Sequence, residues 1–103
     1  MSFLFTDPNA LTSASGNIMD IGVGMASSSA AAAGPTTGVV PAASDPVSAL
    51  TAGHFASHAA LYQAISAQAA LVHEQVVSTL GTNASSYTTA EAANAAASAL
   101  GAS

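Results

Sequence analysis

Two histidines, His54 and His58, stand four residues apart in the second half of the chain. On a helix, this spacing puts both imidazoles on one face, where they can share a metal ion such as zinc. A zinc site needs a third protein ligand, and His73 would lie about 28 Å further along the same helix. Cysteine is absent, and Glu74 is equally remote. We therefore expect no metal site, and we interpret both histidines as interface or core residues with hydroxyl or carbonyl partners.

A second pair at helical spacing, Tyr87 and Glu91, lies near the end of the sequence in a stretch of small residues. A helix through both would present an aromatic ring and a carboxylate acceptor on one face, which suits recognition by a receptor. The alternative is that the ring packs near a helix end and the carboxylate keeps the tail hydrated. The spacing alone favours the alternative.

Nucleophilic catalysis has no framework in this sequence. There is no Gly-x-Ser-x-Gly elbow, no cysteine thiol and no lysine, so the usual activated nucleophiles are missing. The glycine-containing stretch 22–34 follows no predicted strand and precedes no lysine, which argues against a phosphate-binding loop. We expect no catalytic residue, no cofactor and no enzymatic activity.

The charge balance excludes further classes of function. The chain of 103 residues has five acidic residues, no lysine and no arginine, and a formal net charge of −5. Without cations, binding to nucleic acid or to anionic lipid headgroups has no electrostatic basis. The N-terminal sequence lacks the basic region of a secretory signal peptide. No run approaches the roughly 18 apolar residues of a membrane span, so we expect no direct span.

Two helix starts are marked by the same dipeptide. Asp7 precedes Pro8, and Asp45 precedes Pro46. An aspartate can cap the free N–H groups of a first helical turn, and proline suits the first helical position. These signals predict one helix from Pro8 and a second from Pro46.

The stretch between the two helices carries two glycines and two prolines and is predicted to be a connection over 34–44. The expected fold is all-α: an antiparallel hairpin of helices over about 8–33, or slightly beyond, and 46–84. We place the hairpin domain at 1–91. The low-complexity segment 92–103 is expected to be a flexible or partly helical tail.

Apolar residues recur every three or four positions along both predicted helices, and on more than one side of each. Two helices that share one seam cannot bury that much surface, so we expect a partner chain to complete a four-helix bundle. Phe3 and Phe5 are expected to fold over one end of the hairpin. Which row faces the partner stays open, but we expect these residues to contribute to the partner-facing or shared core: Leu11, Ile18, Met25, Phe55, Tyr62, Ile65, Val72, Val76 and Leu80.

The chain resembles the N-terminal domain of the mycobacterial PE family along nearly its whole length. The similar segments are an initial "MSFL" with Pro8, "PTTGVVPAASDPVSAL", "HFASHAALYQAISAQAALVHEQVVSTL" and "SYTTAEAANAAA". Family members usually carry Pro-Glu where this chain has Pro8-Asn9, and an acidic pair is common where it has Ser44-Asp45-Pro46. Asp7 and Asp45 can still cap both helices, so these changes affect the family label more than the architecture.

The resemblance implies a helical hairpin that pairs with a PPE-family protein and leaves the cell through type VII secretion machinery. The family's export signal, Tyr-x-x-x-Asp/Glu, corresponds to Tyr87 and Glu91. The implied location is the medium, the cell surface or the cell envelope, without a conventional signal peptide. Two alternatives stay open: an anchoring or targeting module normally fused to a larger domain, and a self-associating helical bundle.

Overall fold

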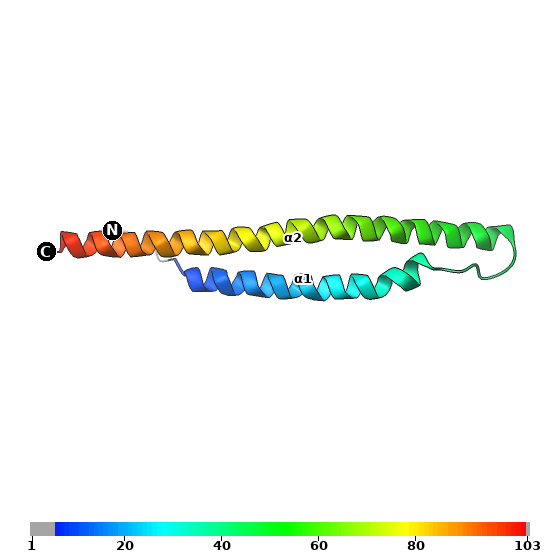
Figure 1. Cartoon of the computed structure of the whole chain (residues 1–103), viewed down its shortest axis with the longest axis horizontal. Helices are drawn as coiled ribbons and strands as arrows, with labels where there is room; N and C mark the ends of the chain where they lie inside the picture. Colours follow the sequence, from blue (N-terminus) through cyan, green and yellow to red (C-terminus); the bar gives the residue numbers. More distant parts are fainter. Residues whose placement is uncertain (1–5, 103) are drawn as a thin grey trace. The chain divides into compact units, whose positions relative to one another are not determined.

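The computed structural model describes residues 6–102, and all regular secondary structure within that range is helical (Figure 1). Helix α1 spans Pro8–Thr37 and helix α2 spans Pro46–Gly101. The predicted all-α fold with two long helices is therefore confirmed. The prediction for Phe3 and Phe5 concerns residues outside the described range.

Both predicted helix starts are confirmed, together with their aspartate caps. The Asp7 carboxylate accepts a hydrogen bond from the backbone N–H of Ala10 at 3.2 Å. The Asp45 carboxylate accepts one from the backbone N–H of Ser48 at 2.8 Å and another from the Ser48 hydroxyl at 2.8 Å. The Ala10 N–H also donates to the backbone carbonyl of Asp7 at 3.1 Å, so both the carboxylate and the carbonyl oxygen of that cap bind the first turn.

The Asp45 cap makes a prediction about acid stability. The backbone N–H of Ser48, and then its hydroxyl, hold the pKa of Asp45 below its ordinary value of 3.8. A depressed folded-state pKa gives stability that is present above the unfolded value and is lost as the pH falls through the folded value. We expect Asp45→Asn to be less stable than the parent at pH 7, with the difference shrinking between pH 5 and pH 2. Thermal melts of both proteins across that range measure the effect; a constant difference would contradict it.

Helix α1 ends slightly beyond residue 33, as the prediction allowed, but it includes the first residues of the predicted connection. The sequence places a connection over 34–44, but α1 continues through Pro35 to Thr37. Proline removes only one donor, and here it lies in the last turn, where the helix is about to end in any case. The Thr36 hydroxyl donates to the carbonyl of Ala32 at 2.6 Å, and Thr37 makes the same bond one residue further on. These two hydroxyls therefore bind carbonyl groups near the helix end. The prediction of a connection from residue 34 did not take these hydrogen bonds into account.

Helix α2 is also longer than predicted. Instead of ending at residue 84, it continues to Gly101 and includes most of the segment expected to be a tail. Alanine has the highest helix propensity, and no proline interrupts the segment. The hydroxyls of Thr88 and Thr89 donate to carbonyls one turn earlier and remain compatible with the helix. The boundary between a 1–91 domain and a 92–103 tail stays a prediction.

The described residues form two compact units, each built from a segment of both helices. One unit pairs the residues up to Asp20 with those from Glu74 onward; the other comprises Ile21–His73. Within each unit the paired segments run antiparallel. In the first unit, the Ser15 hydroxyl donates to the carbonyl of Val77 at 3.0 Å.

Contacts in the Ile21–His73 unit are also polar and antiparallel. The hydroxyl oxygens of Ser29 and Ser66 lie 3.3 Å apart, and the Gln63 amide donates to the carbonyl of Ser29 at 3.0 Å. Hydrogen bonds of this kind fix the register of two helices that have few large side chains between them. Polar contacts thus join the two helices of this unit beside its buried alanines.

Small residues of α2 form the intrachain packing row. Ala52, Ala59 and Ala84 are buried, whereas no residue of α1 is buried. Helices with small facing side chains can approach closely. Its buried and half-buried members lie three or four residues apart except for Ser66 and His73, which are seven apart. In the Ile21–His73 unit they are Ala52, Ala56, Ala59, Gln63, Ser66 and His73, and in the other unit they are Val77, Leu80 and Ala84.

One glycine is required by this packing. A Cβ atom on Gly22 would lie 2.7 Å from two atoms of the His73 ring, whereas a Cβ atom on Gly24 would meet nothing within 4 Å. The imidazole of His73 therefore covers the bare backbone of α1 at Gly22. A real Cβ at 2.7 Å would force the ring or the helix to move.

We expect Gly22→Ala and Gly24→Ala to change stability in opposite directions. Alanine gains about 1 kcal/mol over glycine in a helix interior, and Gly24→Ala should show this gain. In Gly22→Ala the clash with the His73 ring should outweigh this gain in helix propensity, and the substitution should destabilise the protein by about 1–3 kcal/mol through overpacking. Chemical denaturation followed by circular dichroism measures both. Truncation of the ring in Gly22→Ala/His73→Ala should remove the clash; equal behaviour of the two single variants would contradict the predicted contact.

Candidate interaction surface and signal residues

The Ile21–His73 unit leaves its large apolar side chains outside the packing row. Met25, Phe55, Tyr62 and Ile65 are each more than half exposed. We call this surface the apolar face and define it by Ile21 and Met25 of α1 together with Phe55, Leu61, Tyr62, Ile65 and Val72 of α2. A two-helix unit whose small side chains face inward and whose large ones face outward has not completed its own core.

A shallow groove joins the two helices on this face. It has a volume of about 580 Å³ and brings Ile21 and Met25 of α1 to one side of Tyr62 of α2. Gly24, Ser28, Ser29 and Ala32 complete its lining. The rows of α1 and α2 that the sequence left unassigned thus meet along one surface.

The opposite flank of α2 is different in kind. Ala60, Ala64 and Ala67 lie there and are exposed. At about 100° per residue, Ala60 and Ala67 are more than 90° around the helix from Ile65 and Val72. Leu71, which is 62% exposed, lies on the same flank one turn after Ala67, so this flank carries one bulky residue among its alanines.

The predicted interface residues divide into two groups. Met25, Phe55, Tyr62, Ile65, Val72 and Val76 are exposed, and Leu11, Ile18 and Leu80 are half-buried. Ile21 and Leu61 were not among the residues selected from the sequence as interface residues. Their 3–4 spacing was the signal, and only the exposed surface shows that they belong with the selected ones. Whether any of them contacts a partner stays a prediction.

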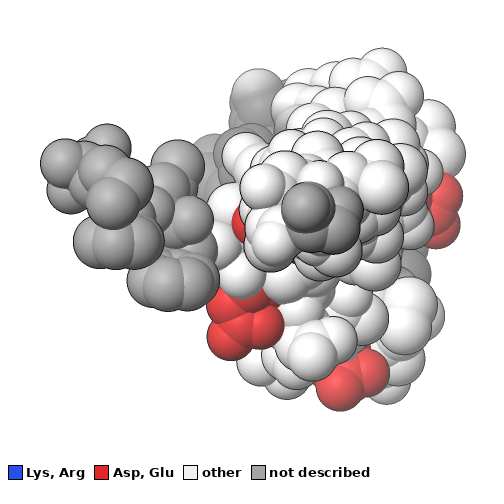
Figure 2. All heavy atoms as spheres, turned by 90° about the vertical axis from the view of Figure 1, so that its left-hand side faces the viewer, with Lys and Arg blue, Asp and Glu red and all other residues white. Residues whose placement is uncertain are grey.

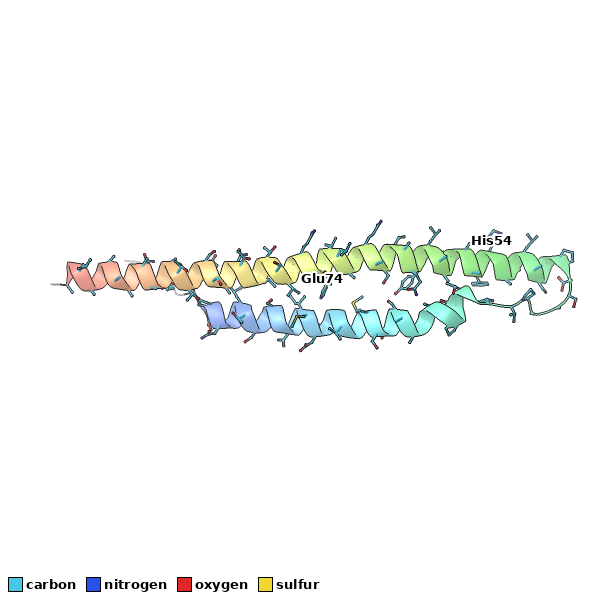
Figure 3. The ribbon with its side chains drawn as sticks, viewed as in Figure 1. His54 and Glu74 are labelled. Atoms are coloured by element: carbon cyan, nitrogen blue, oxygen red, sulfur yellow. The ribbon has the colours of Figure 1, made fainter. Side chains whose placement is uncertain are left out.

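The histidines do not form a metal site together. His54 and His58 are both exposed on α2, where Figure 3 marks His54. His73 instead packs against Gly22. No group of three potential metal ligands occurs within the range 6–102.

Tyr87 and Glu91 lie inside α2. The predicted second helix ended at residue 84, which would have placed both residues beyond it. Because they are one turn apart in a continuous helix, the ring and the carboxylate share a face. Tyr87 is 46% exposed, and Glu91 is exposed as well. Glu91 Oε1 accepts a hydrogen bond from the Thr6 hydroxyl at 2.6 Å, a long-range contact that no local sequence pattern indicates.

The surface is almost uncharged. Figure 2 shows separate acidic groups on a neutral background and no basic group, in agreement with a composition that has no lysine or arginine. Over residues 6–102, neither helix contains a stretch apolar enough to span a bilayer. The side chains that can offer substantial contact energy are therefore apolar and aromatic.

Comparison with known proteins identifies the family. A family model described as "PE family" matches residues 4–94. PE family protein PE13 of Mycobacterium tuberculosis is 57% identical over 97 residues, which cover 94% of this chain and 98% of that protein. PE-PGRS family protein PE_PGRS33 of Mycobacterium tuberculosis is 52% identical over 96 residues, 93% of this chain and 19% of that protein.

A third relative is again much longer than this chain. PE family protein PE8 of Mycobacterium tuberculosis is 46% identical over 99 residues, which cover 96% of this chain and 36% of that protein. The chain thus spans nearly all of one curated relative and only about a fifth and about a third of two others. The match to the family model over most of the sequence, together with these identities, shows that this helical hairpin belongs to the PE family.

Proposed function

We propose that this chain is a non-enzymatic protein that forms a heterodimer with a PPE-family protein and is exported by type VII secretion machinery. The observation that carries the proposal is the inverted distribution of side chains in the Ile21–His73 unit. Alanine and polar residues fill the intrachain row, while the apolar face exposes Met25, Phe55, Tyr62 and Ile65. A partner that covers this face would supply the hydrophobic burial that the chain lacks.

Two helices of the partner would complete a four-helix bundle with α1 and α2. The apolar groove between Ile21, Met25 and Tyr62 offers a place for the side chains of such a helix. Helix pairs with apolar stripes on more than one side commonly bury the second stripe in a bundle of this kind. Family membership supports a role in protein–protein interaction.

Tyr87 and Glu91 would act as the export signal. Their exposure on one face of α2 leaves the phenol ring and a carboxylate oxygen available to a secretion receptor. The complex would then reach the medium, the cell surface or the mycobacterial cell envelope without a conventional signal peptide.

Co-expression with a PPE-like protein encoded next to it tests the heterodimer. We expect the pair to co-purify as one copy of each, with higher helicity and a higher melting temperature than the chain alone. Mass measurement by light scattering after size exclusion gives the stoichiometry. A stable monomer or a folded homodimer of the chain alone, with no gain from the PPE-like protein, would reject the proposal.

A second candidate function is anchoring or targeting of a fused domain. It is favoured by the relatives of which this chain matches only about a fifth or a third. Fusion of residues 1–103 to a reporter domain in a mycobacterial host, followed by fractionation, distinguishes the candidates. Retention of the reporter in the envelope supports anchoring, whereas its release into the medium supports a purely secreted partner subunit.

A further inference from the structure

The Glu91 carboxylate lies where the inward row of α2 passes the start of α1. Glu91 follows the buried Ala84 by seven residues, so on a helix with about 100° per residue it points within about 20° of the same direction. Helix α1 begins at Pro8, and Glu91 is exposed. The carboxylate therefore continues the row that faces α1, at the level where α1 itself has not yet begun.

The residues before α1 are directed along α2 by the way this helix begins. Proline at position 8 disfavours the helical conformation for Asp7, and neither Thr6 nor Asp7 is helical. The carbonyl of Asp7 accepts the N–H of Ala10 at 3.1 Å, which anchors the extended residues to the first turn. Thr6 thus leads on from the end of α1 instead of turning with it.

A second hydrogen bond in the same unit gives the same register. The Ser15 hydroxyl binds the carbonyl of Val77, and Glu91 lies 14 positions, about 21 Å, further along α2. Pro8 lies about 10 Å back along α1 from Ser15, and two extended residues add up to about 7 Å. Side chains span the remaining distance, and the Thr6 hydroxyl donates to Glu91 Oε1 at 2.6 Å. Two contacts far apart in the unit therefore agree on which residues meet.

The hydrogen bond from Thr6 restricts a side chain that would otherwise adopt several rotamers. A hydrogen bond to an ionised oxygen is stronger than one between neutral groups. Immobilising one rotamer-rich side chain on binding costs roughly 2- to 10-fold in affinity, and this cost falls when the side chain is held in place beforehand. Because Glu91 remains exposed, the bond leaves its carboxylate within reach of a receptor. The contact thus orients the carboxylate without hiding it.

We propose that Thr6 is a positioning residue of the export signal, which holds the Glu91 carboxylate in the orientation that a secretion receptor binds. This inference rests on the proposed function, because it takes Tyr87 and Glu91 to be the signal. The recognised surface then includes a residue that precedes α1 as well as a turn of α2. A group that donates a hydrogen bond to the carboxylate is the receptor feature that fits it.

The test measures export of Thr6 variants from a mycobacterial host, as the ratio of culture filtrate to cell lysate. Thr6→Val keeps the shape of the side chain and removes the hydroxyl, and we expect export to fall about 3-fold. Thr6→Ser retains the donor and should export near the parental level. If Thr6 acts through Glu91, adding Thr6→Val to Glu91→Ala should cause no further fall, because the two effects are not additive.

Thr12→Val is the matched control. The Thr12 hydroxyl donates to the carbonyl of Pro8 at 3.0 Å, so the same substitution removes a hydroxyl near the same helix end that binds within α1. Export of this variant should equal that of the parent. Co-purification with the PPE-like protein verifies that every variant still forms the complex.

Several results would overturn the inference while the signal stands, provided that Tyr87→Ala is retained in the cell. They are parental or raised export of Thr6→Val, an equal fall in Thr12→Val, a further fall when Thr6→Val is added to Glu91→Ala, and parental export of Glu91→Ala. Loss of the complex in Thr6→Val would also overturn it, because the hydroxyl would then serve assembly. Unchanged export of Tyr87→Ala would instead reject the proposed signal, and this inference with it.

Discussion

Ile65→Asp/Val72→Asp is expected to abolish formation of the heterodimer. Both side chains are exposed on the apolar face, 63% and 59% respectively. Burial of an isoleucine or valine stabilises by roughly 1.5–3 kcal/mol, and a buried carboxylate without a cation adds a further cost. Together these effects predict a loss of affinity of at least about 100-fold. Pull-down and isothermal titration calorimetry with the PPE-like partner measure the loss.

The matched control is Ala60→Asp/Ala67→Asp. It introduces two aspartates at the same seven-residue separation, on the opposite flank of the same helix, where both alanines are exposed. The charge change is identical, and the loss of helix propensity is at least as large because alanine is the best helix former. We expect the control pair to bind within a few-fold of the parent. Equal losses in both double variants would show that charge or helix propensity, rather than the apolar face, governs association.

Tyr87→Ala is expected to trap the complex inside the cell. The substitution removes the only aromatic ring of the segment from residue 85 to residue 101. If a receptor recognises that ring together with the Glu91 carboxylate, export should fall by at least about 10-fold, which corresponds to roughly 1.4 kcal/mol of recognition. Immunoblots of culture filtrate and cell lysate from a mycobacterial host measure the distribution.

Three controls separate recognition from folding. Tyr87→Phe keeps the ring and should retain more export than Tyr87→Ala. Thr89→Ala changes an exposed residue on another side of α2 and should leave export unchanged. Glu91→Gln keeps the shape of the side chain and removes its charge, so reduced export would assign a role to the carboxylate. Unchanged export of Tyr87→Ala, with the heterodimer intact, would show that these residues are not the signal.

The local elements of the fold could be predicted from the sequence because their causes are local. Asp7 and Asp45 each precede a proline and cap the helix that follows. The helix ends were less accurate. The connection was predicted to begin at residue 34, whereas α1 continues to Thr37, because proline in a last turn removes only one hydrogen bond. The segment 92–103 was predicted to be a flexible or partly helical tail, and α2 continues through it to Gly101, as its alanine content favours.

The sequence could predict rows of apolar residues along each helix, but not which of these rows is exposed. Six of the nine selected interface residues are exposed, whereas Leu11, Ile18 and Leu80 are half-buried. Both kinds of residue recur every three or four positions, so the period cannot distinguish an inward row from an outward one. The contact between Thr6 and Glu91 joins opposite ends of the chain and has no counterpart in any local pattern.

The sequence by itself determined where each helix begins, that the chain has no cation, and that it has more apolar rows than two helices can bury. Only the tertiary structure decided which row lies inside. Close approach of the two helices favours Ala52, Ala59 and the bare backbone of Gly22 over larger side chains. Most of the large apolar residues of the Ile21–His73 unit are left on the outer surface, whereas the imidazole of His73 fits inward because Gly22 opposite it has no side chain.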